Sequence, residues 1–326
     1  MKFRRILALG IAAALATSTS ALQAAEASNW PQRPIRLIMP NAPGSSNDTL
    51  ARIIAVKIGE VLGQQIVIDN RAGAGGVVGM EIGKGAAPDG YTLVGASTAA
   101  MSIAPHIHSR LPYDPVKDYE YISMFGVTPN VLVVNPNLPI KTVKEFVDWA
   151  KVQGPKANMA SAGAGAQSHL TGAALMVAAG IQSTHVPYKG GGASVAAVVA
   201  NESQWTITPA PAVMGLVKSG RLRALGHSLP ERTPLLPDLP SVGETVKGFK
   251  YSGWNGLLAP KGTSRAVLTK VREAVLKAAA MPELKEQFAT QGAVVQTSTP
   301  EAFRELVVQE IKEIAPVVKA AGLKVE

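Results

Sequence analysis

Apolar residues in the first hundred positions follow two different spacings. Short apolar runs at 34–39, 65–69 and 91–95 are typical of buried strands. Residues 48–62 instead place apolar side chains three and four positions apart, which predicts an amphipathic helix, and a second helix is expected from about Gly76. Strands that alternate with helices in this order predict a parallel sheet.

The middle of the chain repeats this alternation. Strands are predicted at 130–135, 157–161, 184–187, 204–208 and 222–226, and helices at 142–152, 168–179 and 192–200. Thr142 and Glu145 have the Thr-x-x-Glu spacing of a capping box, which places the start of the first of these helices. The repeated alternation predicts a second α/β unit, with strands running on from one half to the other. Because ligand pockets favour domain interfaces and the carboxyl ends of parallel strands, we expect a binding cleft between the halves.

The last third of the chain opens with an interruption. Four prolines between 229 and 240 exclude regular structure there. One helix is then predicted at 264–280, and another with Thr299 as its N-cap and Pro300 in its first turn, the favoured place for proline. Pro316 is expected to kink or end this last helix, because proline has no N–H to donate.

The first residues have the pattern of an export signal. Lys2, Arg4 and Arg5 precede an apolar run at 6–16, and small residues follow up to 27. An apolar run of this length is too short to span a bilayer, which needs roughly 20 residues. Residues 1–27 are therefore expected to be a cleavable signal peptide, which predicts a periplasmic location for the mature chain.

Composition narrows the chemistry further. The chain has no cysteine, which excludes disulfides, a thiol nucleophile and a lipid-modified N-terminal cysteine, so we expect a free protein and not a lipid-anchored one. Loss of the signal peptide lowers the formal net charge from +9 to +7, since it removes Lys2, Arg4, Arg5 and Glu26. The remaining basic residues are scattered along the chain, so we expect no nucleic-acid partner.

Two strand-to-helix junctions are the candidate binding loops. Residues 40–48 and 161–169 each follow a predicted strand, open a predicted helix and are rich in small residues. Small residues let the backbone approach a ligand, and a helix N-terminus carries free N–H groups and partial positive charge, so such a loop attracts anions. Either loop alone is also what an ordinary turn with a helix cap would look like. Two such loops in opposite halves of the chain suggest a clamp.

Other kinds of site find little support. The glycines between 73 and 79 do not have the G-x-G-x-x-G spacing, and there is no G-x-x-x-x-G-K-[ST] motif, so a nucleotide cofactor is not expected. The five histidines have no recognised metal-ligand spacing. An exported α/β hydrolase remains the alternative, with Ser168 and His169 as the only adjacent nucleophile and base, but neighbouring helical residues point in different directions. We therefore expect no cofactor, no metal and no catalytic residue.

Longer motifs along the chain resemble a known family. They include APDGYTL at 87–93, LPYDPVKDYEYIS at 111–123, SAGAGAQSHLTG at 161–172, HVPYKGGG at 185–192 and GWNGLLAPKGTS at 253–264. Together they resemble the substrate-binding proteins of tripartite tricarboxylate transporters, also called the Bug or TctC-like family. The resemblance covers the whole mature chain in order.

The resemblance implies a fold, a function and partners. The fold is the two-domain periplasmic-binding-protein fold with two crossovers, a type II-like α/β architecture with its ligand cleft between the domains. Domain 1 is expected to comprise residues 28–126 and 251–326, and domain 2 residues 127–250. The implied function is capture of a small carboxylate (a di- or tricarboxylate or an aromatic carboxylate) by a monomer that delivers it to the large and small subunits of a membrane permease. A sensor that presents its ligand to a two-component system would use the same cleft.

The resemblance also points to the residues of the site. In this family the two junction loops grip the ligand's carboxylate through backbone N–H groups and hydroxyls. The expected ligand-binding residues are Asn41, Ala42, Ser45, Ser46, Ser97, Thr98, Ser161, Gly163, Ala164, Gln167, His169, Tyr188 and Thr208. Asp48 is expected to brace the first loop, because its charge would repel a carboxylate. The family usually has a hydroxyl residue where Ala166 stands, which puts any borrowed ligand in doubt.

Overall fold

The computed structural model describes residues 29–320 and residue 322, so the predicted signal peptide at residues 1–27 lies outside the described residues. Within these residues the strands form one nine-stranded sheet, ordered β2-β1-β3-β9-β4-β7-β5-β6, with β8 paired to β4. The strands are β1 (Ile35–Met39), β2 (Ile66–Asn70), β3 (Thr92–Ser97), β4 (Tyr119–Val134), β5 (Asn158–Ser161), β6 (Thr184–Pro187), β7 (Trp205–Pro209), β8 (Arg223–His227) and β9 (Ser252–Pro260).

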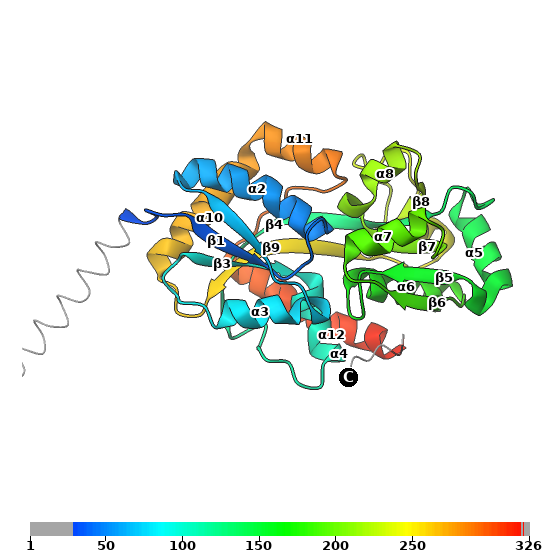
Figure 1. Ribbon diagram of the computed structural model, residues 1–326, viewed down its shortest axis with the longest axis horizontal. Helices are drawn as coiled ribbons and strands as arrows, with labels where there is room; N and C mark the ends of the chain where they lie inside the picture. The colour runs from blue at the N-terminus through cyan, green and yellow to red at the C-terminus, as the bar shows by residue number, and fades with distance from the viewer. Residues whose placement is uncertain (1–28, 321, 323–326) are drawn as a thin grey trace, which may run out of the picture.

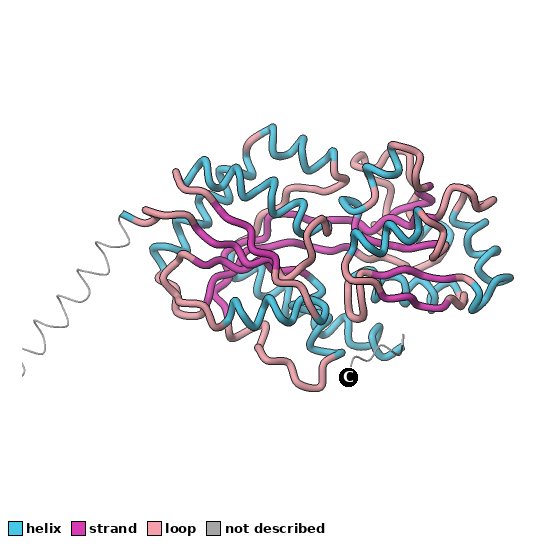
Figure 2. The backbone as a smooth tube through the Cα atoms, viewed as in Figure 1, coloured by secondary structure: helices cyan, strands magenta, loops and turns pink. Residues whose placement is uncertain are grey.

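Helices flank this sheet and fill most of the connections (Figures 1 and 2). The helices are α2 (Ser46–Leu62), α3 (Val77–Lys84), α4 (Ala104–Ile107), α5 (Val143–Gln153), α6 (Gln167–Ala179), α7 (Gly191–Val199), α8 (Met214–Lys218), α9 (Val242–Thr245), α10 (Arg265–Ala280), α11 (Pro282–Thr290) and α12 (Pro300–Ala320), with short turns η1 (Ala74–Gly76), η2 (Ala99–Ile103), η3 (Gly154–Lys156) and η4 (Ala210–Ala212). None of the helices in the described part of the chain combines the length and the apolar character needed to cross a membrane.

Two lobes share the sheet, and two strands run between them (Figure 1). Residues 119–129 of β4 pair antiparallel with β9 in the first lobe, and residues 130–134 pair antiparallel with β7 in the second. Pairing is parallel among β1, β2 and β3 and among β5, β6 and β7. The parallel arrangement predicted from the sequence is thus found in the outer strands of each lobe, whereas the central strands β4 and β9 make the sheet mixed.

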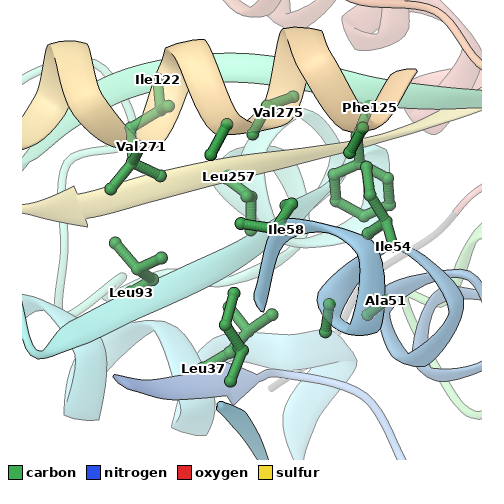
Figure 3. Packing of buried hydrophobic residues seen from close by; sticks show 14 of the residues in the cluster. Leu37, Ala51, Ile54, Ile58, Leu93, Ile122, Phe125, Leu257, Val271 and Val275 are labelled. Carbon is green, nitrogen blue, oxygen red and sulfur yellow. The ribbon is translucent and has the colours of Figure 1, made fainter. Parts of the chain in front are cut away.

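The core of the first lobe lies on both faces of its strands. On one face, Leu37 and Leu93 from the sheet pack against Ile54 of α2 and Val271 of α10, all nearly inaccessible to solvent (Figure 3). Apolar side chains at three- and four-residue spacing bring one stripe of α2 onto the sheet, as the sequence pattern predicts. The opposite face is covered by α3, η2 and α12. Burial of each leucine-sized side chain contributes about 2 kcal/mol to this packing.

The second lobe has the same three-layer construction. Trp205 of β7 is fully buried and meets Phe146 of α5 edge to face, with ring centroids 5.0 Å apart. Helices α5, α6 and α9 lie on this face of the sheet, and α7, η4 and α8 cover the other. The capping box predicted at Thr142 is confirmed, since its hydroxyl accepts the Glu145 N–H at 3.1 Å and the Glu145 carboxylate accepts the Thr142 N–H at 3.2 Å.

The last helix joins the two lobes. The Phe303 ring of α12 contacts Trp254 of β9 in the first lobe, with centroids 5.1 Å apart. Further along the helix, Ile314 and Val318 pack with Leu170 of α6 in the second lobe. The expectation that Pro316 would end or kink the helix is wrong as to its end, because α12 continues to Ala320. Apolar contacts on both sides of the proline hold the helix on the protein and offset the missing hydrogen bond.

Four helices of the structure, α4, α8, α9 and α11, were not predicted from the sequence pattern. Helix α11 begins with Pro282, only one residue after α10 ends at Ala280. With so short a break between them, the apolar pattern does not show α11 as a separate helix. Residues 99–107 form a π-turn and a short helix and are mostly buried on all sides, so they lack the polar face on which amphipathic patterns depend.

Candidate functional site

A cavity of about 510 Å³ lies between the lobes, where the carboxyl ends of six strands meet, namely β1, β2, β3, β5, β6 and β7. Each strand that reaches it continues directly into a loop that lines the cavity, and most of these loops open a helix. The lining residues are Pro40, Asn41, Ala42, Ser45, Ser46, Asn47, Ala72, Gly73, Ala74, Gly75, Gly76, Ala99, Ala162, Gly163, Ala164, Ala166, Gln167, Ser168, Tyr188, Lys189, Gly190, Gly191, Thr208, Pro209 and Ala212.

The first candidate loop joins β1 to α2. Ser45 is the N-cap of α2, and its hydroxyl accepts the Asp48 N–H at 3.3 Å. The next N–H groups, on Ser46 and Asn47, have no acceptor within the helix because they belong to its first turn. This loop therefore presents free backbone donors and the positive end of a 17-residue helix to the cavity.

Asp48 braces this loop from behind. Its carboxylate accepts hydrogen bonds from the Gly44 N–H at 2.8 Å, from Arg52 Nε at 3.0 Å and from Asn70 Nδ2 at 2.8 Å. Burial by itself would raise the pKa of Asp48, but the hydrogen bonds from Arg52, Asn70 and Gly44 outweigh it and lower that pKa. The Asn70 amide also donates to the Asn41 carbonyl at 3.0 Å, so Asp48 and Asn70 together tie the loop to β2.

The second candidate loop joins β5 to α6. The Ala162 N–H donates to Ser168 Oγ at 3.0 Å, which folds the loop back over the helix start. The Gly165 N–H donates to His169 Nδ1 at 3.2 Å. Ala166 is the N-cap of α6 and makes no side-chain cap hydrogen bond, so the first N–H groups of this helix also face the cavity without a protein cap.

A stacked histidine pair supports the second loop. The rings of His169 and His185 are nearly parallel, with centroids 3.7 Å apart and 10° between their planes. Burial first, and then the neighbouring His185, lower the pKa of His169 to about 4, and burial also lowers the pKa of His185. Because its Nδ1 accepts the Gly165 N–H, His169 serves the loop in its neutral form.

Charge around the cavity favours an anionic ligand. Among the lining residues no side chain is acidic, and Lys189 is the one that carries a charge. The remaining polar groups are the amides of Asn41, Asn47 and Gln167 and the hydroxyls of serine, threonine and tyrosine. A site of this kind binds carboxylates through neutral donors, helix dipoles and one nearby cation.

Nine of the thirteen expected ligand-binding residues lie at this cavity. They are Asn41, Ala42, Ser45, Ser46, Gly163, Ala164, Gln167, Tyr188 and Thr208. The structure places the other four, Ser97, Thr98, Ser161 and His169, outside the cavity lining. Ser97 is buried in β3, and Thr98 Oγ1 accepts the Trp254 N–H at 3.3 Å. Ser161 is fully buried and hydrogen-bonded to His185 at 2.6 Å, and His169 lies behind the loop. These side chains point into the protein, where their contacts hold the loops in place.

Two further loops line the cavity, and Tyr188 is the only one of their residues that was expected there. Residues 72–76, between β2 and α3, lie opposite the second candidate loop, and residues 188–191, between β6 and α7, lie opposite the first. Both are strand-to-helix junctions rich in glycine. The rule that carboxyl ends of parallel strands share one edge would have identified them. The glycines at 73–79 were compared only with the pattern of a dinucleotide-binding loop, which they do not match.

The lobes touch each other across the cavity. Ser46 Oγ donates to the Pro209 carbonyl of the other lobe at 3.3 Å. At Gly190, an added Cβ would lie 2.8 Å from the Cβ of Ala42, and at Gly75 it would lie 3.6 Å from the backbone of Gly165. These contacts join the two lobes directly across the mouth of the cavity.

The described residues offer metal ions and nucleotides no comparable site. Within residues 29–320 and 322, no group of three or more His, Asp or Glu side chains gathers in a way that would hold a metal ion. The glycine loop 73–76 faces the cavity, but its spacing is not that of a nucleotide fingerprint.

The fold and site define a class. Two α/β lobes, linked by two crossing strands and closed on a cavity, form a periplasmic binding protein of the two-domain kind. Residues 50–323 match the model of the tripartite tricarboxylate transporter family receptor. The chain belongs to this family, and the resemblance seen in its motifs is confirmed.

Relatives and solved structures agree with this assignment. Protein BugT of Bordetella pertussis is 33% identical over 329 residues, covering 100% of both chains. The structure of the periplasmic binding protein BugD is 30% identical with a TM-score of 0.86, covering 90% of this chain and 99% of that one.

Two solved relatives contain ligands. An R. palustris protein with adipate is 27% identical, with a TM-score of 0.88, and covers 91% of this chain and 99% of its own. MatC from Rhodopseudomonas palustris with bound malate is 29% identical, with a TM-score of 0.83, and covers 89% of this chain and 100% of its own.

Proposed function

We propose that this chain is a periplasmic receptor that closes around a small carboxylate and delivers it to the large and small subunits of a tripartite membrane permease. The observation that carries the proposal is the closed cavity, which has helix N-termini from both lobes and Lys189 at its wall but no acidic side chain. The adipate and malate in two relatives of the same fold support a carboxylate ligand.

The energies of such a site suffice for useful affinity. A hydrogen bond to a charged group contributes about 1.5–3 kcal/mol. Four or five of these would give about 10 kcal/mol before the costs of desolvation and lost motion are subtracted. A net binding free energy of about −8 kcal/mol corresponds to a micromolar dissociation constant. We therefore assign ligand contact to the nine expected residues at the cavity, with Lys189 added to them.

A hydrolase needs an exposed nucleophile beside a base. The two candidate pairs, Ser168 with His169 and Ser161 with His185, have no exposed nucleophile. Ser168 Oγ is buried and accepts the Ala162 N–H. Ser161 Oγ does lie 2.6 Å from His185 Nε2, but Ser161 is fully buried, and the His185 ring stacks on a second histidine instead of pairing with a carboxylate. These observations favour a receptor that does no chemistry on its ligand.

The remaining parts of the proposal concern the chain as a whole. We assign residues 1–27 to a cleavable signal peptide and take the mature protein to be a free periplasmic monomer. We place domain 1 at residues 28–126 and 251–326 and domain 2 at residues 127–250. The strand register supports crossings near these boundaries, since β4 changes partner between Pro129 and Asn130, and β9 begins at Ser252.

A thermal-shift screen of the mature protein tests the function. The panel contains dicarboxylates, tricarboxylates, aromatic carboxylates and amino acids, and calorimetry follows each hit. A ligand at 100 times its dissociation constant adds about 2.7 kcal/mol to the free energy of unfolding. In the variant Ala164→Leu, a larger side chain fills part of the cavity, so the shift is expected to vanish, whereas Ala164→Ser should keep it.

Two results would contradict the proposal. The first is the absence of a shift with every acid, and the second is an equal shift in Ala164→Leu. Deletion of the gene then separates transport from sensing, because loss of the receptor abolishes uptake of the identified acid. Intact uptake with loss of induction by that acid would point to a sensor.

A further inference from the structure

A second cavity, of about 330 Å³, lies behind the ligand cavity. It is formed where α12 crosses from one lobe to the other, beside the start of α6 and the strand β9. Its lining residues are Thr98, Gln167, Leu170, Thr171, Ser228, Leu229, Pro230, Lys250, Tyr251, Ser252, Glu310, Glu313, Ile314 and Val317. Gln167, the first residue of α6, lines both cavities and so stands between them.

The Gln167 side chain is fixed in this place by contacts to both crossing strands. Its Nε2 donates to Oδ1 of Asn130 on β4 at 3.2 Å, and Asn130 is fully buried. The amide also lies against Gly253 of β9, where an added Cβ would come within 2.2 Å of Gln167 Nε2. A glycine at 253 is therefore what leaves room for the glutamine amide.

The rest of the partition is backbone. Thr98 and Ala99 are consecutive residues, and Thr98 lines the second cavity while Ala99 lines the first. The Trp254 N–H donates to Thr98 Oγ1 at 3.3 Å, which ties this segment to β9. Gln167 is thus the one residue that lines both cavities, next to the fixed stretch at Thr98 and Ala99.

The second cavity suits an aliphatic tail better than a second carboxylate. Leu170, Ile314 and Val317 supply apolar surface on one side. Glu310 and Glu313 lie in the same lining, with Lys250 as the one cation. A carboxylate placed there would meet two acidic groups, whereas a chain of methylenes would meet the apolar side chains.

We propose that Gln167 is a specificity-determining residue that sets the upper limit on ligand length by closing the ligand cavity against the second one. This inference rests on the proposed carboxylate function. With the glutamine in place, an acid whose carboxylate is held by the loops must fit within the first cavity. Without it, the tail of a longer acid extends into the second cavity.

Calorimetry with two homologous series tests the proposal. The ligands are straight-chain monocarboxylates and α,ω-dicarboxylates of three to ten carbons, titrated into the wild type and Gln167→Ala. The wild type is expected to show a sharp loss of affinity beyond a certain length. In Gln167→Ala that limit moves by two or more methylenes, each added methylene raising the affinity about fourfold, and monocarboxylates gain more than dicarboxylates.

Gln167→Met is the matched control. Methionine has nearly the same length as glutamine, so it keeps the partition but cannot donate to Asn130 or to a ligand. Its affinity for all acids is expected to fall together, whereas the length at which affinity is lost should stay that of the wild type. The proposal is overturned if Gln167→Ala keeps the wild-type limit, or if Gln167→Met broadens the range equally while circular dichroism shows both variants folded. Failure of every acid to bind the wild type would overturn the carboxylate function itself and this inference with it.

Discussion

Buried titratable side chains at the site act by holding loops in place. Asp48 and His169 both accept a backbone N–H from the loop that precedes their helix, Gly44 for the first and Gly165 for the second. One is a carboxylate and the other a neutral imidazole, but each lies four residues after the glycine whose N–H it accepts. The shape of the anion site therefore depends on side chains that do not touch the ligand.

His169 makes stability depend on pH. Its pKa in the folded protein, about 4, is lower than the ordinary value of 6.5, so the unfolded chain takes up a proton at a higher pH than the folded one. The contribution is complete above about pH 6.5, and the free energy of unfolding should fall by about 2 kcal/mol as the pH drops to about 4. Urea unfolding at several pH values measures this slope.

His169→Asn is the informative variant for this slope. Asparagine has a carbonyl oxygen close to the position of Nδ1, so it can still accept the Gly165 N–H, but it does not titrate. The fall in stability between pH 6.5 and 4 should become shallower than in the wild type. An unchanged slope would mean that other groups dominate acid sensitivity.

Among the elements, α12 has the most unusual position. It packs on the sheet of the first lobe and on α6 of the second, and it carries the partly buried carboxylate Glu310. Burial raises the pKa of Glu310, although hydrogen bonds from Ser102 Oγ at 2.5 Å and Trp254 Nε1 at 2.7 Å act in the opposite direction. The ionised form of the Glu310 side chain is therefore disfavoured in this poorly solvated place.

Replacement of Glu310 by glutamine should stabilise the protein at pH 7. The amide oxygen can accept the same two hydrogen bonds, while the cost of burying a charge is gone. Because burial raises the pKa of Glu310, its ionised form is destabilising, so the gain should shrink as the pH falls toward 4 and the carboxyl becomes protonated in the wild type.

Differential scanning calorimetry across this pH range measures the effect of the Glu310 variant. Glu305→Gln, an exposed residue of the same helix, is the control and should change stability little at any pH. A loss of stability in Glu310→Gln at pH 7 would show that the carboxylate is needed in its charged form.

At the scale of the whole molecule, function depends on how closely the lobes approach. Ala42 of the first lobe and Gly190 of the second lie so close that a single methyl group would not fit between them. On the proposed function, binding uses backbone donors from loops of both lobes, so full affinity would need this close approach.

Gly190→Ala should therefore weaken binding more than it weakens folding. The new Cβ, 2.8 Å from that of Ala42, overpacks only the closed form, at a cost of about 1–3 kcal/mol, so affinity for the identified carboxylate should fall about tenfold or more. Gly190 has a φ of 103°, so some strain is added as well.

Gly248→Ala is the matched control for this strain. Gly248 has a φ of 79° and no atom within 4 Å of an added Cβ, so it shares the backbone strain without the contact between lobes. Calorimetric affinities of the two variants are compared, with scattering measurements of compactness in the liganded state. Equal affinities would contradict the role of close approach at Gly190.

Local patterns along the sequence determined most of the elements and the chemical character of the site. Apolar spacing identified α2, α10 and the outer strands, the Thr142 capping box placed α5, and the small-residue junctions at 40–48 and 161–169 predicted an anion site. These features depend on neighbours within a few residues, so they can be predicted without the fold. The motifs along the mature chain indicated its family for the same reason.

Contacts between distant residues were decided only by the tertiary structure. The passage of β4 through both lobes, the antiparallel insertion of β9 and the continuation of α12 past Pro316 depend on packing partners far along the chain. The stacking of His169 on His185, the two additional glycine loops and the place of Gln167 between two cavities have the same origin. Periodicity reveals which face of an element is buried, but only the packed fold decides which distant side chains meet there.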